Sequence, residues 1–252
     1  PGANAAFSFR LLNTDYTGDC VTVRRASDNN TTNIGFVDGV IDVDTLESFC
    51  SGTDGFVTDW YSQNGNDYRA RNTTASQQPK IVSNGTAIKY NSKVALDYYS
   101  TSCQLFLSDE LNNVISIDYN TGFVVSKITA LSTANYIAFN NSPTVGVGFG
   151  GTVSGVNGAF IFDGSFKSIS GEDLNQHLGY FNDTGTNHEI AVDGGTVTSF
   201  SRALQLQFDR IGRDNAFTYA NSLVSEVVLY SSNQSSNKAG IEDNINTYYS
   251  IY

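Results

Sequence analysis

Apolar and polar residues alternate in short runs along most of the chain. The runs are rich in Val, Ile, Phe, Tyr and Thr, and they are separated by Gly, Asn, Ser and Asp. Such alternation is typical of half-buried β-strands, and the separating residues are those that tight turns favour. So many short strands indicate an all-β sandwich or jelly roll. The pattern predicts strands in residues 20–25, 55–61, 87–99, 103–107, 122–131, 159–166, 188–195, 203–212 and 223–230.

Two segments have a helical pattern instead. Asp44 can cap a short helix within residues 42–50, and Glu47 follows at the spacing of a capping box. Near the C-terminal end, Ser235 or Ser236 can cap a second helix. Its apolar positions recur at helical spacing and should pack onto the sandwich; they are Ile241, Ile245, Tyr248 and Tyr252.

The glycine-rich residues 145–158 are the best candidate for a domain boundary. Their alternating Val and Phe residues suit a strand followed by a flexible loop. No Pro-rich or charged linker divides the chain, so residues 1–252 are predicted to form one domain. The sequence contains no Met and begins at Pro1, so we expect a processed protein or part of a longer chain.

The composition excludes several kinds of partner. With a formal net charge of −11, the chain lacks the basic character that binding to nucleic acids or anionic membranes requires. No apolar run is long enough for a membrane-spanning helix. No cofactor is indicated, although a Ca²⁺ site lined by carboxylates stays open. Cys20, Cys50 and Cys103 lack zinc-binding spacing; three buried thiols are favoured over one disulfide with one free thiol.

Few residues suit catalysis. His177 and His188 are the only histidines, and no GxSxG motif accompanies them, so a serine hydrolase is disfavoured. The carboxylates Asp214 and Glu226 stand in an otherwise apolar and aromatic run. Glycosidases use two carboxylates about 5–9.5 Å apart. Glu226 alternates with Val224 and Val228, which predicts that all three lie on one face of a sheet.

Two stretches carry a family resemblance. Residues 5–36, "AAFSFRLLNTDYTGDCVTVRRASDNNTTNIGF", and residues 44–67, "DTLESFCSGTDGFVTDWYSQNGND", resemble the start of the catalytic domain of fungal-type α-L-arabinofuranosidases. The same opening is common in structural proteins predicted for tailed and marine phages. The resemblance implies a concanavalin A-like (laminin-G-like) jelly roll with a short helix in its N-terminal region and a C-terminal helix.

The resemblance also bears on the acids. Asp214, in "IGRDN", is similar to the acid/base of those enzymes. The position of their Glu nucleophile falls near Ala159, where no acid stands, and Asp163 is the nearest substitute. This comparison implies that the nucleophile is missing, that Asp214 is a vestigial acid/base and that the chain is not an enzyme.

The favoured interpretation is therefore a phage virion surface protein. It would be a capsid decoration, head fibre or tail fibre domain that self-associates as a homo-oligomer and contacts other virion proteins. Adhesion to host glycans is compatible, because sugar rings stack on aromatic side chains; the candidates are Trp60, Tyr61, Tyr68, Phe217 and Tyr219. The alternative is an arabinofuranosidase-like glycoside hydrolase.

Overall fold

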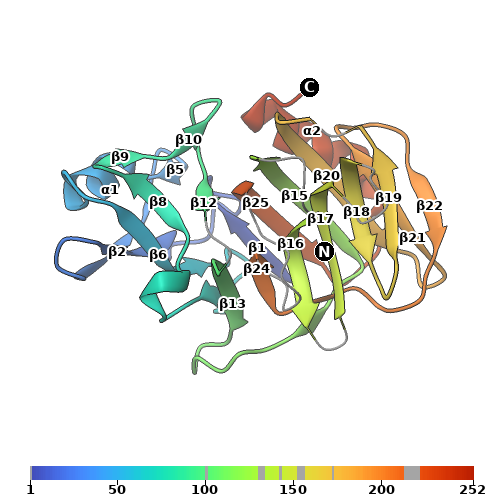
Figure 1. Ribbon diagram of the computed structural model, residues 1–252, viewed down its shortest axis with the longest axis horizontal. Helices are drawn as coiled ribbons and strands as arrows, with labels where there is room; N and C mark the ends of the chain where they lie inside the picture. The colour runs from blue at the N-terminus through green and yellow to red at the C-terminus, as the bar shows by residue number, and fades with distance from the viewer. Residues whose placement is uncertain are drawn as a thin grey trace.

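The computed structural model describes residues 2–99, 102–129, 134–141, 144–151, 157–171, 173–212 and 222–252. It confirms the all-β sandwich with one short helix early in the chain and one at the end (Figure 1). Neither helix in these ranges has the length and apolar character needed to cross a membrane. Cys20, Cys50 and Cys103 are buried free thiols, as expected.

Most of the strands join in one sheet. Its 19 members are β1 (Ala5–Ser8), β2 (Val21–Arg25), β3 (Thr31–Ile34), β6 (Gly55–Tyr61), β7 (Arg69–Arg71), β8 (Lys80–Ser83), β9 (Thr86–Ala87), β12 (Leu96–Tyr98), β13 (Gln104–Ser108), β15 (Thr121–Ile128), β16 (Ala134–Asn141), β17 (Thr144–Gly151), β18 (Asn157–Phe162), β19 (Phe166–Ser170), β20 (Gln176–Asp183), β21 (Asn187–Val192), β22 (Thr198–Ser201), β24 (Arg210–Gly212) and β25 (Ser222–Tyr230).

The remaining elements are short, apart from the terminal helix. Three two-stranded ladders join β4 (Phe36–Val37) to β5 (Val40–Ile41), β10 (Lys89–Tyr90) to β11 (Lys93–Val94), and β14 (Ile117–Asp118) to β23 (Gln207–Phe208). The helices are α1 (Val43–Phe49), α2 (Lys238–Tyr249) and the 3₁₀ turns η1 (Ala75–Gln77) and η2 (Ser235–Asn237).

The large sheet wraps around a core and nearly closes into a barrel. One layer, the back layer, runs β22–β21–β20–β15–β25; the other, the front layer, runs β13–β24–β16–β17–β18–β19. The path β25–β12–β8–β6–β7–β13 connects the two layers. Phe149 of β17 meets Phe181 of β20 at 5.9 Å between ring centroids, so the front layer packs on the back layer. At the open side, β18 and β19 contact β21.

Helix α1 is capped two residues earlier than predicted. The Asp42 carboxylate accepts hydrogen bonds from the backbone N–H of Thr45 at 2.9 Å and from its hydroxyl at 2.7 Å. Asp44 lies in the first turn, and Glu47 accepts the N–H of Ala87 at 2.9 Å instead of completing a capping box. Glu47 thus fastens α1 to β9.

Helix α2 packs onto the sandwich, as predicted, and covers the outer face of the back layer. Its buried apolar residues differ in part from those predicted. Ile245 and Tyr249 are its buried apolar residues and pack against Phe123, Leu178 and other residues of β15, β20 and β21. Tyr252 is 54% exposed, because the helix stops at Tyr249. No side chain caps the N-terminus of α2, because both predicted caps, Ser235 and Ser236, lie in η2.

Glu226 is a buried ion-pair partner on the outer face of the back layer. Arg10 reaches its carboxylate through Nε at 2.8 Å and Nη2 at 3.0 Å, and the Ser8 hydroxyl donates at 2.7 Å. The Tyr249 hydroxyl of α2 donates to the same carboxylate at 3.3 Å. The pair therefore joins the chain after β1, the strand β25 and the helix α2.

The predicted face of Glu226 is partly wrong. The register shifts between β15 and β25: Glu226 lies opposite Val125, and Val224 lies opposite Ser126. Ser225 therefore has no residue opposite it on β15 and forms a bulge. Such a bulge puts the residues on its two sides out of phase. Val224 consequently faces the core, whereas Glu226 and Val228 share the outer face.

Replacing Glu226 with Gln should lower the free energy of unfolding by about 3–5 kcal/mol, because the Arg10 guanidinium would stay buried without its counter-charge. Urea unfolding measures this loss, with Glu110→Gln, an exposed carboxylate, as the matched control. The double variant Arg10→Met/Glu226→Leu should lose less than Glu226→Gln, because it removes both charges. A loss below about 1 kcal/mol for Glu226→Gln would contradict this assignment.

Candidate functional site

Trp60 is a core residue, so its prediction as a glycan contact is wrong. Its side chain is fully buried and lies stacked on Phe9, with 4.8 Å between ring centroids and 10° between ring planes. The cause is a register shift between β2 and β6 that skips Thr58. Strict alternation would turn Trp60 away from Val57, but the extra residue turns both side chains into the core.

Tyr61 and Tyr68, in contrast, line one cavity, which we call the tyrosine cavity. It encloses about 240 Å³. Its lining combines three phenol rings with two carboxylates and a guanidinium: Tyr16, Tyr61, Tyr68, Asp67, Glu110 and Arg69, together with Ser62 and Gly65. Tyr61 and Tyr68 were predicted from the sequence, whereas Tyr16 and the two acids were not.

The turn between β6 and β7 builds this cavity. Tyr61 at the end of β6 pairs with Arg69 at the start of β7. Gly65 and Asp67 have φ values of 79° and 53°, in the left-handed region that tight turns use. The backbone N–H of Ser62 donates to the carbonyl of Tyr68 at 2.9 Å, which closes the turn. The aromatic rings are therefore held by backbone pairing rather than by a long free loop.

Two of the three tyrosine hydroxyls, those of Tyr61 and Tyr16, are anchored within the fold. The Tyr61 hydroxyl lies 3.0 Å from the Thr22 hydroxyl, and the Tyr16 hydroxyl donates to the carbonyl of Asp19 at 2.9 Å. Burial raises the pKa of Tyr16 well above its ordinary value, so its hydroxyl stays protonated. Fixed rings beside carboxylates suit a sugar, whose C–H face stacks on a ring while its hydroxyls donate to the acids.

A second cavity, the polar cavity, lies beside the first along β7 and β13. It encloses about 320 Å³ and is lined by amide, hydroxyl and guanidinium groups with one aromatic ring: Arg71, Asn72, Thr73, Thr74, Gln77, Phe106, Ser108 and Asn112, with Val114. Arg69 of the tyrosine cavity bonds to Asn112 of the polar cavity, so the two are neighbours. Alternation in β13 could have revealed Phe106, because Leu105 and Leu107 face the core.

Asp214, Phe217 and Tyr219 lie outside the described residues. The strand that leads to them, β24, ends at Gly212, which pairs with Gln104 of β13. Arg210 of β24 lies over the Phe106 ring at 4.8 Å and donates to Asp209 at 2.7 Å. Through Phe106, which pairs with Arg210, the polar cavity adjoins β24.

Asp163, the suggested substitute nucleophile, is sequestered. Its side chain is fully buried, pairs with Lys167, and accepts the N–H of Ala203 at 2.7 Å. The Nε2 atom of His188 lies 3.1 Å from its carboxylate. Although burial acts to raise it, these hydrogen bonds hold the pKa of Asp163 below its ordinary value. A carboxylate occupied in this way cannot reach a substrate.

The described residues form no recognisable metal site. No three His, Cys, Asp or Glu side chains in those ranges are grouped so that they could hold a metal ion. The Ca²⁺ site stays a prediction.

Comparisons with known proteins identify relatives. The family model "Alpha-L-arabinofuranosidase B, catalytic" matches residues 1–134. A search of curated proteins gave no match.

Three solved arabinofuranosidase structures share this fold. A glutamate-to-glutamine mutant of a family 54 α-L-arabinofuranosidase, soaked with 4-nitrophenyl α-L-arabinofuranoside, has a TM-score of 0.73 at 15% identity. A family 54 enzyme soaked with a cyclic sulfate inhibitor has 0.71 at 16%. An arabinofuranosidase complexed with arabinofuranosyl-α-1,2-xylobiose has 0.67 at 15%. The matches cover 96% of this chain and 62% of each of those chains.

These relatives overturn the interpretation as a non-enzymatic virion surface protein. The matched family is a catalytic-domain family, and the structures with the same fold come from glycosidases, which favours the alternative stated from the sequence. Since the family model covers more than half of the sequence, the chain belongs to the family of α-L-arabinofuranosidase B catalytic domains.

Proposed function

We propose that this chain is a glycoside hydrolase that acts on α-L-arabinofuranosides. The observation that carries the proposal is the match of residues 1–134 to an arabinofuranosidase catalytic-domain family. The shared fold over 96% of the chain with structures that contain arabinofuranosides supports it. The polar and tyrosine cavities add a surface rich in amides, hydroxyls and aromatic rings, the groups that bind sugars.

Asp214 is the proposed general acid. A carboxylic acid at this position would give its proton to the leaving oxygen as the glycosidic bond breaks, and as carboxylate it would then activate water. This assignment rests on the "IGRDN" resemblance and on the family to which the chain belongs.

The mechanism requires a second carboxylate. In a retaining enzyme it would attack the anomeric carbon from about 5–5.5 Å away from the acid; in an inverting enzyme it would activate water from about 6.5–9.5 Å. Asp163 and Glu226 do not suit this role, because buried partners occupy both. Asp209 is the closest described acid before Asp214 in sequence, and Arg210 binds both of its oxygens. Asp67 and Glu110 are exposed carboxylates at the neighbouring tyrosine cavity.

Asp214→Asn should lower kcat/KM for 4-nitrophenyl α-L-arabinofuranoside. For methyl α-L-arabinofuranoside the loss in kcat/KM should be larger, about 10²–10⁴-fold. The methoxide leaving group is the stronger base and depends more on protonation. Steady-state kinetics with both substrates measures the difference, and Asp15→Asn, an exposed acid, is the control. Equal activity of Asp214→Asn and the wild type, or an inactive wild type, would overturn the proposal.

Tyr68→Ala should raise KM for arabino-oligosaccharides about tenfold while kcat changes little, since a ring that only holds substrate contributes uniform binding. Tyr68→Phe keeps the ring and should stay within about twofold of the wild type. Both variants are compared by initial rates over a substrate series. If Tyr68→Ala leaves KM unchanged, the tyrosine cavity is not part of the substrate site.

A further inference from the structure

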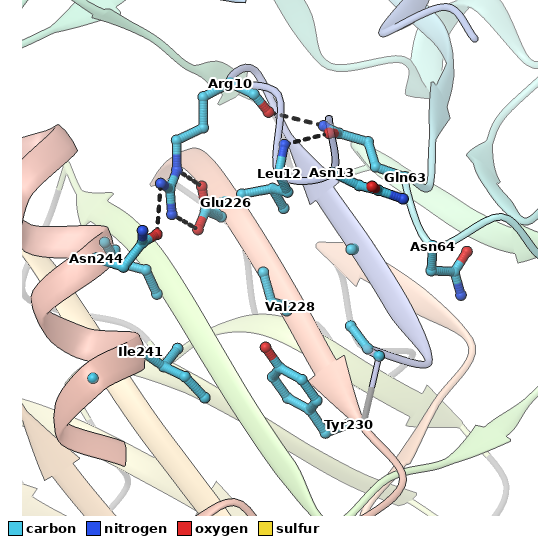
Figure 2. Close-up of a pocket in the computed structure, with 15 residues that line it drawn as sticks. Arg10, Leu12, Asn13, Gln63, Asn64, Glu226, Val228, Tyr230, Ile241 and Asn244 are labelled. Carbon is cyan, nitrogen blue, oxygen red and sulfur yellow. Dashed lines mark hydrogen bonds and ion pairs between the residues drawn. The ribbon is translucent and has the colours of Figure 1, made fainter. Parts of the chain in front are cut away.

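A third cavity lies under helix α2, where β1 pairs with β25 (Figure 2). We call it the helix cavity. It encloses about 400 Å³, a size at the lower end of the range for small-molecule sites, which is about 300–1,000 Å³. Its floor is apolar, formed by Ala6, Val228, Ile241 and Ile245. Gln63 and Asn64 line the opposite side, on the turn that also supplies Ser62 and Gly65 to the tyrosine cavity.

The polar side of the helix cavity is rigid. Arg10 binds Glu226 through two nitrogens and donates to the Asn244 side chain at 2.8 Å (Figure 2). Gln63 donates to the carbonyl of Arg10 at 2.9 Å and accepts the N–H of Leu12 at 2.7 Å. A site held in this way loses little freedom when a ligand binds.

The charges around the cavity favour an uncharged ligand. Arg10 and Glu226 are its charged lining residues among the described part of the chain, and they neutralise each other. The neutral pair offers no free counter-charge to a cation or an anion, and the net charge of −11 on the whole chain further disfavours an anion.

Tyr230 supplies a hydroxyl without an internal partner. Within the described ranges no hydrogen bond to this hydroxyl is formed, and Figure 2 shows it directed toward the space between Val228 and Ile241. Burial raises the pKa of Tyr230, so the hydroxyl stays protonated and can both donate and accept. An apolar floor with one free hydroxyl matches a sugar, which has an apolar C–H face and hydroxyls on its rim.

Gly240 lies at an open part of the wall of the helix cavity. It lies in the first turn of α2, where glycine is less favourable than alanine. Its backbone does not require glycine, and a Cβ atom built on it meets nothing within 4 Å. The packing of this chain therefore gives no reason for glycine at this position. Because glycine has no side chain, the wall of the helix cavity is open at Gly240.

We propose that the helix cavity binds a neutral sugar of one or two residues. The site is distinct from the polar and tyrosine cavities, and it does not depend on hydrolysis by this chain.

Protein-observed NMR titration with D-galactose and L-arabinose tests the proposal. Free monosaccharides carry no glycosidic bond, so they report binding alone. In the wild type we expect saturable shifts of the amide signals of Tyr230 and Gly240. D-galacturonate, the charged counterpart of galactose, should bind at least fivefold more weakly.

Two substitutions at one position separate blocking from misfolding. Gly240→Leu fills the cavity wall and should raise Kd more than tenfold. Gly240→Ala should leave Kd within twofold of the wild type and should raise the midpoint of urea unfolding, since alanine favours the helix. Tyr230→Phe removes only the hydroxyl and should raise Kd severalfold.

Several outcomes would overturn the proposal: no shifts in the cavity up to the solubility limit of both sugars, equal binding of D-galacturonate, or unchanged Kd in Gly240→Leu. The titration is repeated in Asp214→Asn, where binding should persist. A failure of hydrolysis and a failure of the helix cavity are thus observed separately.

Discussion

The buried pair of Arg10 and Glu226 holds together the parts of the fold that are farthest apart in sequence. Through it, the chain after β1, the late strand β25 and the terminal helix α2 meet at one point. Arg10 also binds Asn244 of α2 and accepts a hydrogen bond from Gln63 at its carbonyl. Because Glu226 is buried and Arg10 largely so, each charge is tolerated only beside the other. The pair fixes how α2 sits on the back layer, and so defines the wall of the helix cavity.

The pair also settles the role of one of the two acids that stand out in the sequence. A buried carboxylate that accepts hydrogen bonds from Arg10, Ser8 and Tyr249 is committed to holding the fold together. Glu226 is therefore a scaffold residue, which leaves Asp214 as the acid to which the family relationship gives a chemical role. The polar cavity provides sugar-compatible groups along β13, the strand that pairs with β24.

Alternation in the sequence predicts many of the strands, because the core side of a sheet must be apolar at every second residue. It misses β20, whose eight residues are all buried and therefore do not alternate. It fails at bulges, since one extra residue changes the face of every later side chain. Val224, before Ser225, is assigned to the face of Glu226 for this reason, and the bulge at Thr58 likewise turns Trp60 into the core beside Val57. The tyrosine cavity was half predicted: Tyr61 and Tyr68 stand out by residue type, whereas Asp67 and Glu110 come together only through the pairing of β7 with β13. The helix cavity depends on contacts between the two ends of the chain, which no local pattern reveals.

Covalent labelling tests the central claim, hydrolysis of α-L-arabinofuranosides, most directly. An arabinofuranose-configured cyclic sulfate, the class of inhibitor soaked into one of the related enzymes, is an electrophile that a catalytic carboxylate can open. Intact-mass spectrometry should show one added inhibitor, and a peptide map should place it on a single Asp or Glu other than Asp214, Asp163 or Glu226. That residue would be the second carboxylate of a retaining mechanism. An unlabelled protein that also fails to hydrolyse 4-nitrophenyl α-L-arabinofuranoside would contradict the account.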